Sequence, residues 1–269
     1  MTVVVAVKIS DGIIVSSDSA SSLMNGPSVL NIYNNANKIF NLRKGLPIGA
    51  MTCGAGSVGK LSIATISKDF RAILTADPDA NSATVSDLTH RYFEYLRVEH
   101  YEKCHPPGNP DNPRLNLWVF GFSPGESLPE IWEFSFGDVI IAPKETVPRN
   151  ESGLAWGGEP ELIQRVVLGY GATLPKNLAD LGVAAPLIDQ ALGAQRALHP
   201  IVTDAMPVQD AIELAEFLVR STIDFCRFKI GAPTVGGPIE VAAVTKHEGF
   251  KWVKRKHYFD QTLNPELEE

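Results

Sequence analysis

Short runs of β-branched and other apolar residues dominate the start of the chain. Residues 3–9 and 13–17 form two such runs, and Asp11-Gly12 separates them. Glycine tolerates the positive φ that a tight turn needs, so this pattern predicts a β-hairpin in the first eighteen residues. Residues 19–37 are rich in Ser, Asn and Gly, and we expect a loop there.

Further along, strand-like and helix-like segments occur in separate groups. Residues 38–42 and 46–53 have strand character, and we expect them to join the hairpin in one antiparallel sheet. Apolar residues at helical spacing predict helices over about 61–76, from 82 or 84 to 103, over 159–168, over 176–198 with a break at Pro186, and over 207–228. Thr84 and Asp87 have the spacing of a capping box. Strands are expected at 115–122, 130–136, 139–142, 155–158, 239–245 and 250–253. Because helices do not alternate one for one with strands, this order favours two packed antiparallel sheets with helices outside both.

Composition narrows the class of protein. The 269 residues are 44% hydrophobic and carry a net charge of −7, which fits one large domain over residues 1–269 and argues against nucleic acid or an anionic membrane as a partner. The three scattered cysteines are typical of free thiols in a reducing cytoplasm. We expect neither a signal peptide nor a membrane span. The acidic end, about 260–269, is expected to be frayed, and the basic stretch at residues 251–256 is interpreted as a solvated strand face.

A glycine-rich segment, residues 54–59, matches GxGxxG between a predicted strand and a predicted helix. A nucleotide site would need a βαβ unit, whereas a second helix is expected next, and Leu61 stands where a P-loop has Ser or Thr. A tight turn with no ligand is a second interpretation. In a third, free N–H groups at a helix start stabilise an oxyanion during acyl transfer.

The residue behind the initiator methionine is a threonine, Thr2. If Met1 is removed, Thr2 carries a hydroxyl and a free α-amine on one residue. That amine titrates near pH ~8, so the residue can serve as nucleophile and base together. The predicted hairpin returns Asp18 toward Thr2.

Four residues, Thr2, Asp18, Lys38 and Gly54, occur in an order and spacing that resemble the proteasome β-subunit family of N-terminal-nucleophile hydrolases. The segments that carry the resemblance are TVVVAVKISDGIIVSSD, NKIFNL, IGAMTCGAGSVGK and VGGPIEVAAVTKHEGF. It is close over residues 2–76 and looser over 153–168 and 207–253. It implies an α+β fold, a four-layer αββα sandwich of two antiparallel sheets.

By this resemblance, Thr2 is the nucleophile, Lys38 lowers the barrier to deprotonating its hydroxyl, Asp18 holds Lys38, and the Gly54 N–H stabilises the oxyanion. The resemblance also places three substrate-contacting residues, which are Ser21, Ser22 and Thr52. The physical chemistry agrees, because an ammonium beside an alcohol favours the alkoxide and a carboxylate keeps that ammonium charged. No cofactor and no metal are implied.

The chain departs from the family pattern near the terminal amine. An Asp-x-x-Ser motif usually binds that amine, and Ala232 and Val235 occupy those positions here. Glu159 and Thr234 are our candidates for orienting the amine instead. Only Met1 precedes Thr2, so activity is expected to depend on removal of Met1.

The resemblance implies a threonine endopeptidase that acts on unfolded protein or peptides, in homo-oligomeric rings, with an ATP-dependent unfoldase as a candidate partner. Two alternatives stay open: a ring-forming scaffold or binding protein that keeps Met1, and an amidase of the same fold that acts on small amides. The size of the assembly would separate the amidase from a compartmentalised peptidase.

Overall fold

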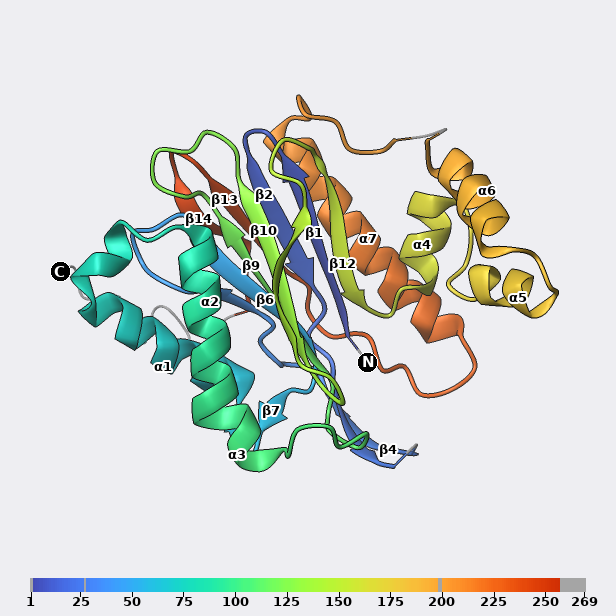
Figure 1. The fold of residues 1–269 in the computed structure, drawn as a ribbon, viewed down its shortest axis with the longest axis horizontal. Helices are drawn as coiled ribbons and strands as arrows, with labels where there is room; N and C mark the ends of the chain where they lie inside the picture. Colours follow the sequence, from blue (N-terminus) through green and yellow to red (C-terminus); the bar gives the residue numbers. More distant parts are fainter. Residues whose placement is uncertain (1, 27, 198–199, 257–269) are drawn as a thin grey trace.

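The computed structural model describes residues 2–26, 28–197 and 200–256. Two five-stranded antiparallel sheets lie face to face, and helices cover the outer face of each, so the expected four-layer αββα sandwich is confirmed (Figure 1). Met1 and the acidic end at 260–269 lie outside the described residues, so the expectation of a frayed end stays a prediction.

The first sheet has the strand order β12-β1-β2-β13-β14. Its strands are β1 (Val3–Ile9), β2 (Gly12–Ser17), β12 (Gly153–Gly158), β13 (Glu240–Thr245) and β14 (Gly249–Lys254). The predicted N-terminal hairpin is confirmed as β1 and β2. The long helix α7 (Val208–Phe228) covers the outer face, with α4 (Glu161–Leu168), α5 (Leu174–Asp180) and α6 (Ala185–Ala197) beside it.

The second sheet has the order β11-β10-β9-β6-β5. It comprises β5 (Ile39–Asn41), β6 (Ile48–Gly54), β9 (Leu115–Gly121), β10 (Glu130–Phe136) and β11 (Ile141–Val147). The expectation that β5 and β6 join the N-terminal hairpin is wrong, because β6 pairs with β5 and β9. Strand character alone does not say which sheet a strand enters.

Helices α1 (Ile63–Ala76) and α2 (Val85–Leu96) cover the outer face of the second sheet. The capping box is confirmed, since the Thr84 side chain accepts from the Asp87 N–H and the Asp87 carboxylate accepts from the Thr84 N–H. The predicted helix to residue 103 continues after α2 as a π-helical turn (Arg97–Tyr101) and a short α3 (Glu102–Cys104). A 3-10 helix (Pro78–Asn81) joins α1 to α2.

The unbroken apolar run of β1 follows from its position between two layers. Val3, Val5 and Val7 pack with α7, whereas Val4 and Ala6 pack against the second sheet. Side chains of a strand alternate between faces, so a strand covered on both sides is apolar at every position. This burial holds the first residues of the chain firmly in the sheet.

Residues 19–37 are not a plain loop, which corrects the expectation. They contain a two-stranded hairpin, β3 (Ser21–Asn25) and β4 (Ser28–Tyr33), that extends from the body of the molecule (Figure 1). Leu23, Leu30 and Tyr33 are exposed on it. The expectation of a loop rested on the Ser and Asn content of the segment and gave too little weight to the β-favouring residues that lie among those polar residues.

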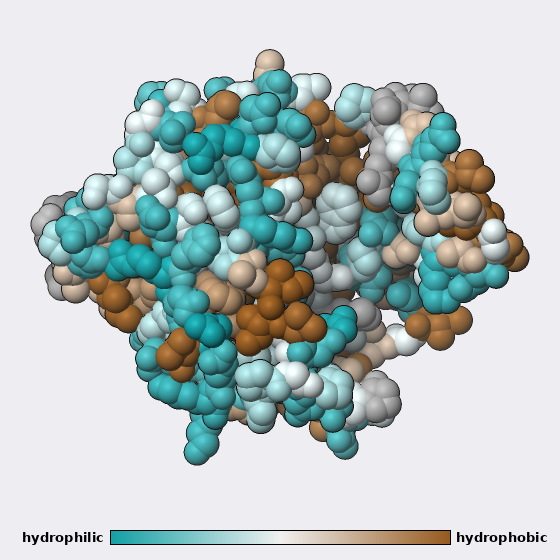
Figure 2. Space-filling model, viewed as in Figure 1, coloured by the Kyte–Doolittle hydropathy of each residue, from teal (hydrophilic) through white to brown (hydrophobic). Residues whose placement is uncertain are grey.

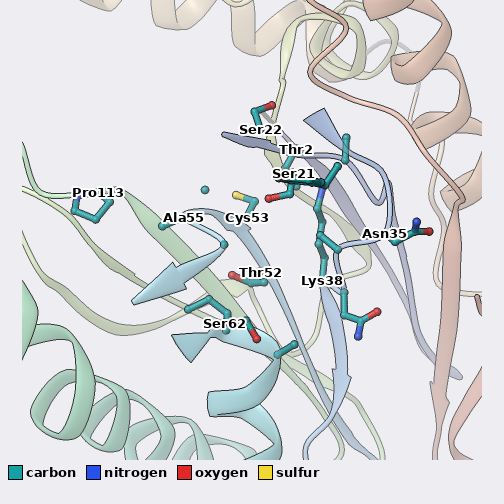
Figure 3. Close-up of a pocket in the computed structure, with 18 of the residues that line it drawn as sticks. Thr2, Ser21, Ser22, Asn35, Lys38, Thr52, Cys53, Ala55, Ser62 and Pro113 are labelled. Atoms are coloured by element: carbon teal, nitrogen blue, oxygen red, sulfur yellow. The ribbon is translucent and has the colours of Figure 1, made fainter. Parts of the chain in front are cut away.

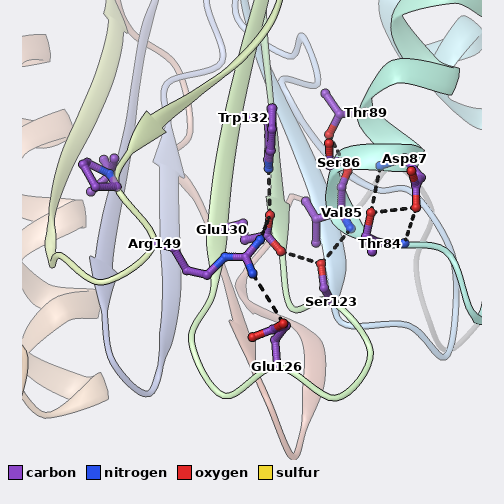
Figure 4. A network of polar contacts seen from close by, with 12 residues as sticks. Thr84, Val85, Ser86, Asp87, Thr89, Ser123, Glu126, Glu130, Trp132 and Arg149 are labelled. Carbon is purple, nitrogen blue, oxygen red and sulfur yellow. Dashed lines mark hydrogen bonds and ion pairs between the residues drawn. The ribbon is translucent and has the colours of Figure 1, made fainter.

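A buried polar cluster joins β10, the start of α2 and the segments that follow β9 and β11 (Figure 4). Glu130 is fully buried and accepts from the Ser123 hydroxyl and from the Trp132 Nε1–H at 3.0 Å, and it pairs with Arg149 at 2.8 Å. The Ser123 hydroxyl also accepts from the N–H of Val85 at 3.0 Å. Because the Glu130 charge is fully partnered, the cluster has a structural role.

Candidate active site

Thr2 lies immediately before β1, beside a cavity of about 880 Å³ that we call the Thr2 cavity (Figure 3). Thr2 is only 5% exposed, and its carbonyl accepts from the Glu159 N–H at 2.7 Å. Gly158 packs against the same carbonyl with φ +90°, and a Cβ at that position would lie 1.7 Å from the Thr2 oxygen. The backbone of Thr2 is therefore held from the β12 side.

Asp18, just past the end of β2, is fully buried and joins three segments of the chain. Its carboxylate accepts from the N–H groups of Val3 at 2.9 Å, Ala20 at 3.1 Å and Gly236 at 3.0 Å. It also accepts from the Lys38 Nζ at 2.5 Å, in an ion pair whose side chains are almost fully buried. All of these donors suit an ionised carboxylate, so the structure positions Asp18 as an anion.

Lys38, immediately before β5, lines the Thr2 cavity, and its side chain extends toward Thr2 in Figure 3. Burial lowers the pKa of Lys38 below its ordinary value, and the Asp18 carboxylate opposes that shift. Burial thus makes the Lys38 ammonium easier to deprotonate than that of an ordinary lysine.

A second buried ion pair lies near Lys38 and is absent from the sequence-based site. Lys256 donates to Glu240 at 2.8 Å, to the Ala36 carbonyl at 2.8 Å and to the Ser19 hydroxyl at 2.7 Å. Interpreting residues 251–256 as one solvated face is therefore wrong for Lys256, whose side chain is 8% exposed. The Lys256 charge also lowers the pKa of Lys38. Local sequence gives no sign that the two ammonium groups approach each other.

The glycine segment ends β6 and turns the chain along the wall of the Thr2 cavity. Gly54 has φ +95°, and a Cβ there would lie 2.3 Å from the Arg114 carbonyl, to which Ala55 donates at 2.8 Å. A small hairpin, β7 (Ser57–Val58) and β8 (Leu61–Ser62), separates this turn from α1. Since β6 is antiparallel to both neighbours, the GxGxxG segment is not in a parallel βαβ unit, which removes the nucleotide interpretation.

The three predicted substrate-contacting residues also line the Thr2 cavity. Ser21 and Ser22 begin β3 on one wall. Thr52, on β6, donates its N–H to the Lys38 carbonyl at 2.9 Å and its hydroxyl to the Asn116 carbonyl at 3.1 Å. Sequence reasoning therefore selected residues that the fold does gather around one cavity, although their roles stay predictions.

The positions expected to orient a free Thr2 amine are buried in the structure. Val235 is buried among apolar side chains beside β1. Thr234 is 5% exposed, and its hydroxyl has no hydrogen-bond partner among the described residues. Glu159 is also 5% exposed, and its carboxylate lies 3.6 Å from the Nζ of Lys229. A buried hydroxyl and a buried carboxylate are both able to accept from an ammonium group.

Among the described residues, no group of three or more His, Cys, Asp and Glu side chains could hold a metal ion, and no helix is long and apolar enough to cross a membrane. The candidate site brings together a threonine, a lysine, a buried carboxylate and backbone N–H groups.

Comparison with known proteins gives a likeness in fold. No protein-family model matches the chain, and no curated protein matches it. Among solved structures, the chain resembles Anbu (ancestral beta-subunit) from Yersinia bercovieri, with a TM-score of 0.52 and 16% sequence identity. The match covers 95% of this chain and 88% of that one.

These findings correct the family assignment made from the motifs. Identification as a proteasome β-subunit is wrong, because no family model matches and the likeness to Anbu (ancestral beta-subunit) at 16% identity concerns the fold alone. The physical reason is that the matching segments are hairpins, core strands and glycine turns, which a shared architecture constrains in unrelated families as well. The fold itself is a four-layer αββα sandwich, and the likeness to Anbu (ancestral beta-subunit) agrees with it.

Proposed function

We propose that this protein is a hydrolase that cleaves peptide bonds with Thr2 as an N-terminal nucleophile. The observation that carries the proposal is the convergence on one cavity of Thr2, of Lys38 held by the buried Asp18, and of the Gly54 turn. The αββα fold supports it, since the fold places the start of β1 beside the end of β2.

The proposed reaction begins once Met1 has been removed. The Thr2 hydroxyl attacks the carbonyl carbon of the scissile bond and passes its proton through the free amine, while the Lys38 ammonium stabilises the developing alkoxide. The Gly54 N–H donates to the oxyanion of the tetrahedral intermediate. The C–N bond breaks, the amine product leaves with the proton, and water hydrolyses the ester on Thr2.

Glu159 and Thr234 would bind the free amine of Thr2. Within the described part of the chain, the buried Glu159 carboxylate forms one ion pair, at 3.6 Å with the half-exposed Lys229, and the Thr234 hydroxyl has no hydrogen-bond partner. A new ammonium at Thr2 would satisfy such groups, because buried polar atoms without partners cost free energy.

The proposal includes unfolded protein or peptides as substrates and self-association into rings in the cytoplasm, with an ATP-dependent unfoldase as a further partner. Exposed apolar surface supports self-association: Leu181 and Leu187 are 81% and 60% exposed, and Figure 2 shows apolar surface on the α5–α6 region. Light scattering during size-exclusion chromatography measures the assembly. A monomer would contradict the ring.

The decisive test is the intact mass of the purified protein with and without a peptide epoxyketone, which needs both a free amine and the Thr2 hydroxyl. We expect a mass that lacks Met1 and gains one adduct per chain. Thr2→Ala should take no adduct, whereas Thr65→Ala, which removes another hydroxyl from the cavity wall, should keep it. A chain that retains Met1 and takes no adduct would refute the hydrolase and favour the scaffold.

A further inference from the structure

A second cavity lies where the two sheets end on the same side of the molecule. β5 is the last strand of the second sheet and β14 the last strand of the first. Residues from both strands and from α1 line a cavity of about 200 Å³, which we call the edge cavity. It is separate from the Thr2 cavity, and no sequence motif points to it.

Four cationic residues line the edge cavity: Lys44, Lys68, Arg71 and Arg255. Within residues 2–26, 28–197 and 200–256, none of these four side chains forms an ion pair with a carboxylate. Arg255 lies over the Trp252 ring with its guanidinium carbon 4.8 Å from the ring centroid, which orients the group at the cavity wall. Unpaired cations gathered around one hollow attract an anionic ligand.

The acidic residue of the edge cavity does not cancel this charge. Glu240 is buried and already pairs with the buried Lys256 at 2.8 Å. The pair is neutral as a unit, so the net charge presented to a ligand is positive. Arg71 is half-buried on α1. An ion pair between Arg71 and an anionic ligand would therefore be screened less by solvent than one at a fully exposed side chain.

The edge cavity lies next to the Thr2 cavity. Asn37 and Lys68 line both. Among the described residues that line the Thr2 cavity are Lys38, Lys68 and Arg114, and none of these described residues is Asp or Glu. A polypeptide that occupies the Thr2 cavity can therefore reach the edge cavity with side chains a few residues away from the one beside Thr2.

We propose that the edge cavity binds acidic side chains of the polypeptide whose neighbouring residues occupy the Thr2 cavity, so that the protein selects substrates with clustered Asp or Glu. The selection rests on the proposed function, because it names the substrate class of that site. The carboxylates form charge-assisted hydrogen bonds with Arg71 and Arg255, whose planar guanidinium groups match carboxylate geometry.

The test measures binding without turnover. Thr2→Ala protein is titrated against two fluorescein-labelled peptides of equal length, one with a run of Glu and the other with Gln in its place. Fluorescence anisotropy should show about tenfold tighter binding of the Glu peptide at low ionic strength, an advantage that shrinks at 0.5 M salt because surface ion pairs are screened. Equal affinities would overturn the proposal.

Two variants made in the Thr2→Ala protein locate the effect. Arg71→Gln with Arg255→Gln should remove the preference for the Glu peptide, with the thermal midpoint measured to confirm folding. The matched control Lys251→Gln neutralises an exposed cation of β14 that does not line the edge cavity, and it should keep the preference. A preference that survives the double change would overturn the assignment.

Two further measurements distinguish an acidic polypeptide from a small free anion as the ligand, and the anion site from the hydrolase. In the first, inorganic phosphate is titrated by calorimetry. If phosphate binding depends on Arg71 and Arg255 while both peptides bind equally, the site binds free anions and the polypeptide assignment is overturned. Wild-type protein that prefers the Glu peptide but hydrolyses neither would refute the proposed hydrolase and leave the anion site standing. If both peptides bind equally and are hydrolysed at equal rates, the hydrolase stands and the proposed anion site is overturned.

Discussion

Replacing Asp18 with Asn is the sharpest test of how the candidate site is held together. The change keeps the size of the side chain and removes the charge that faces the Lys38 ammonium at 2.5 Å. It also weakens the acceptor for three backbone N–H groups, which lie at 2.9, 3.1 and 3.0 Å. Breaking one partner of a buried ion pair costs about 3–5 kcal/mol, which is a large part of the roughly 5–15 kcal/mol that stabilises a typical domain.

The assay is urea unfolding followed by fluorescence and circular dichroism, with Asp18→Asn, Lys38→Met and the double variant measured together. We expect Asp18→Asn to lower the free energy of unfolding by about 3–5 kcal/mol. Lys38→Met removes the stranded ammonium, so the double variant should recover about 2 kcal/mol relative to the sum of the single changes. A cost below about 1 kcal/mol, or strict additivity, would refute the argument that the pair is coupled.

The pH dependence of the same variant gives an independent check. Burial lowers the pKa of Lys38 from its ordinary 10.5, so between the folded and unfolded pKa values the unfolded state binds more protons and stability rises with pH. Without the Asp18 charge, the pKa of Lys38 in the folded state falls further. The pH range over which stability rises with pH therefore extends to lower pH. The stability deficit of Asp18→Asn should therefore be smaller at pH 9 than at pH 6. A deficit that does not change with pH would contradict this.

Three further predictions concern positions around the site and at the far end of β1. Gly158→Ala should cost at least about 2 kcal/mol in urea unfolding, because its φ is +90° and the new Cβ would clash with the Thr2 carbonyl; wild-type stability would contradict this. In native protein at pH 8.5, iodoacetamide should label the exposed Cys104 and spare Cys53, where burial raises the thiol pKa to about 12. Peptide mass mapping checks this, and equal labelling would contradict it. Lys8 is buried and donates to three backbone carbonyls, so Lys8→Met should lower the unfolding free energy by about 2–3 kcal/mol; a loss under about 0.5 kcal/mol would show that those carbonyls find other donors.

Features with a local physical cause could be predicted from the sequence. Asp11-Gly12 favours one tight turn, so the N-terminal hairpin could be predicted and is present in the structure. Thr84 and Asp87 have the spacing of a capping box, so the start of α2 could also be predicted. The hairpin in turn brings Asp18 back beside the start of β1, where it accepts from the Val3 N–H. The family assignment was wrong because such local motifs indicate a shared fold, and proteins of different families can share a fold.

Tertiary structure decided which distant segments meet. Nothing near Asp18 in the sequence indicates that the Gly236 N–H, 218 residues away, completes its set of donors. Nor does the sequence show that Lys256 is buried against Glu240 while its neighbour Arg255 lines the edge cavity. The sheet that β5 enters, and the cavity between its edge and that of the other sheet, depend on packing across the whole sandwich. Residue patterns encode turns, caps and buried faces, whereas pairing between remote strands and the burial of individual charges arise only when the layers pack together.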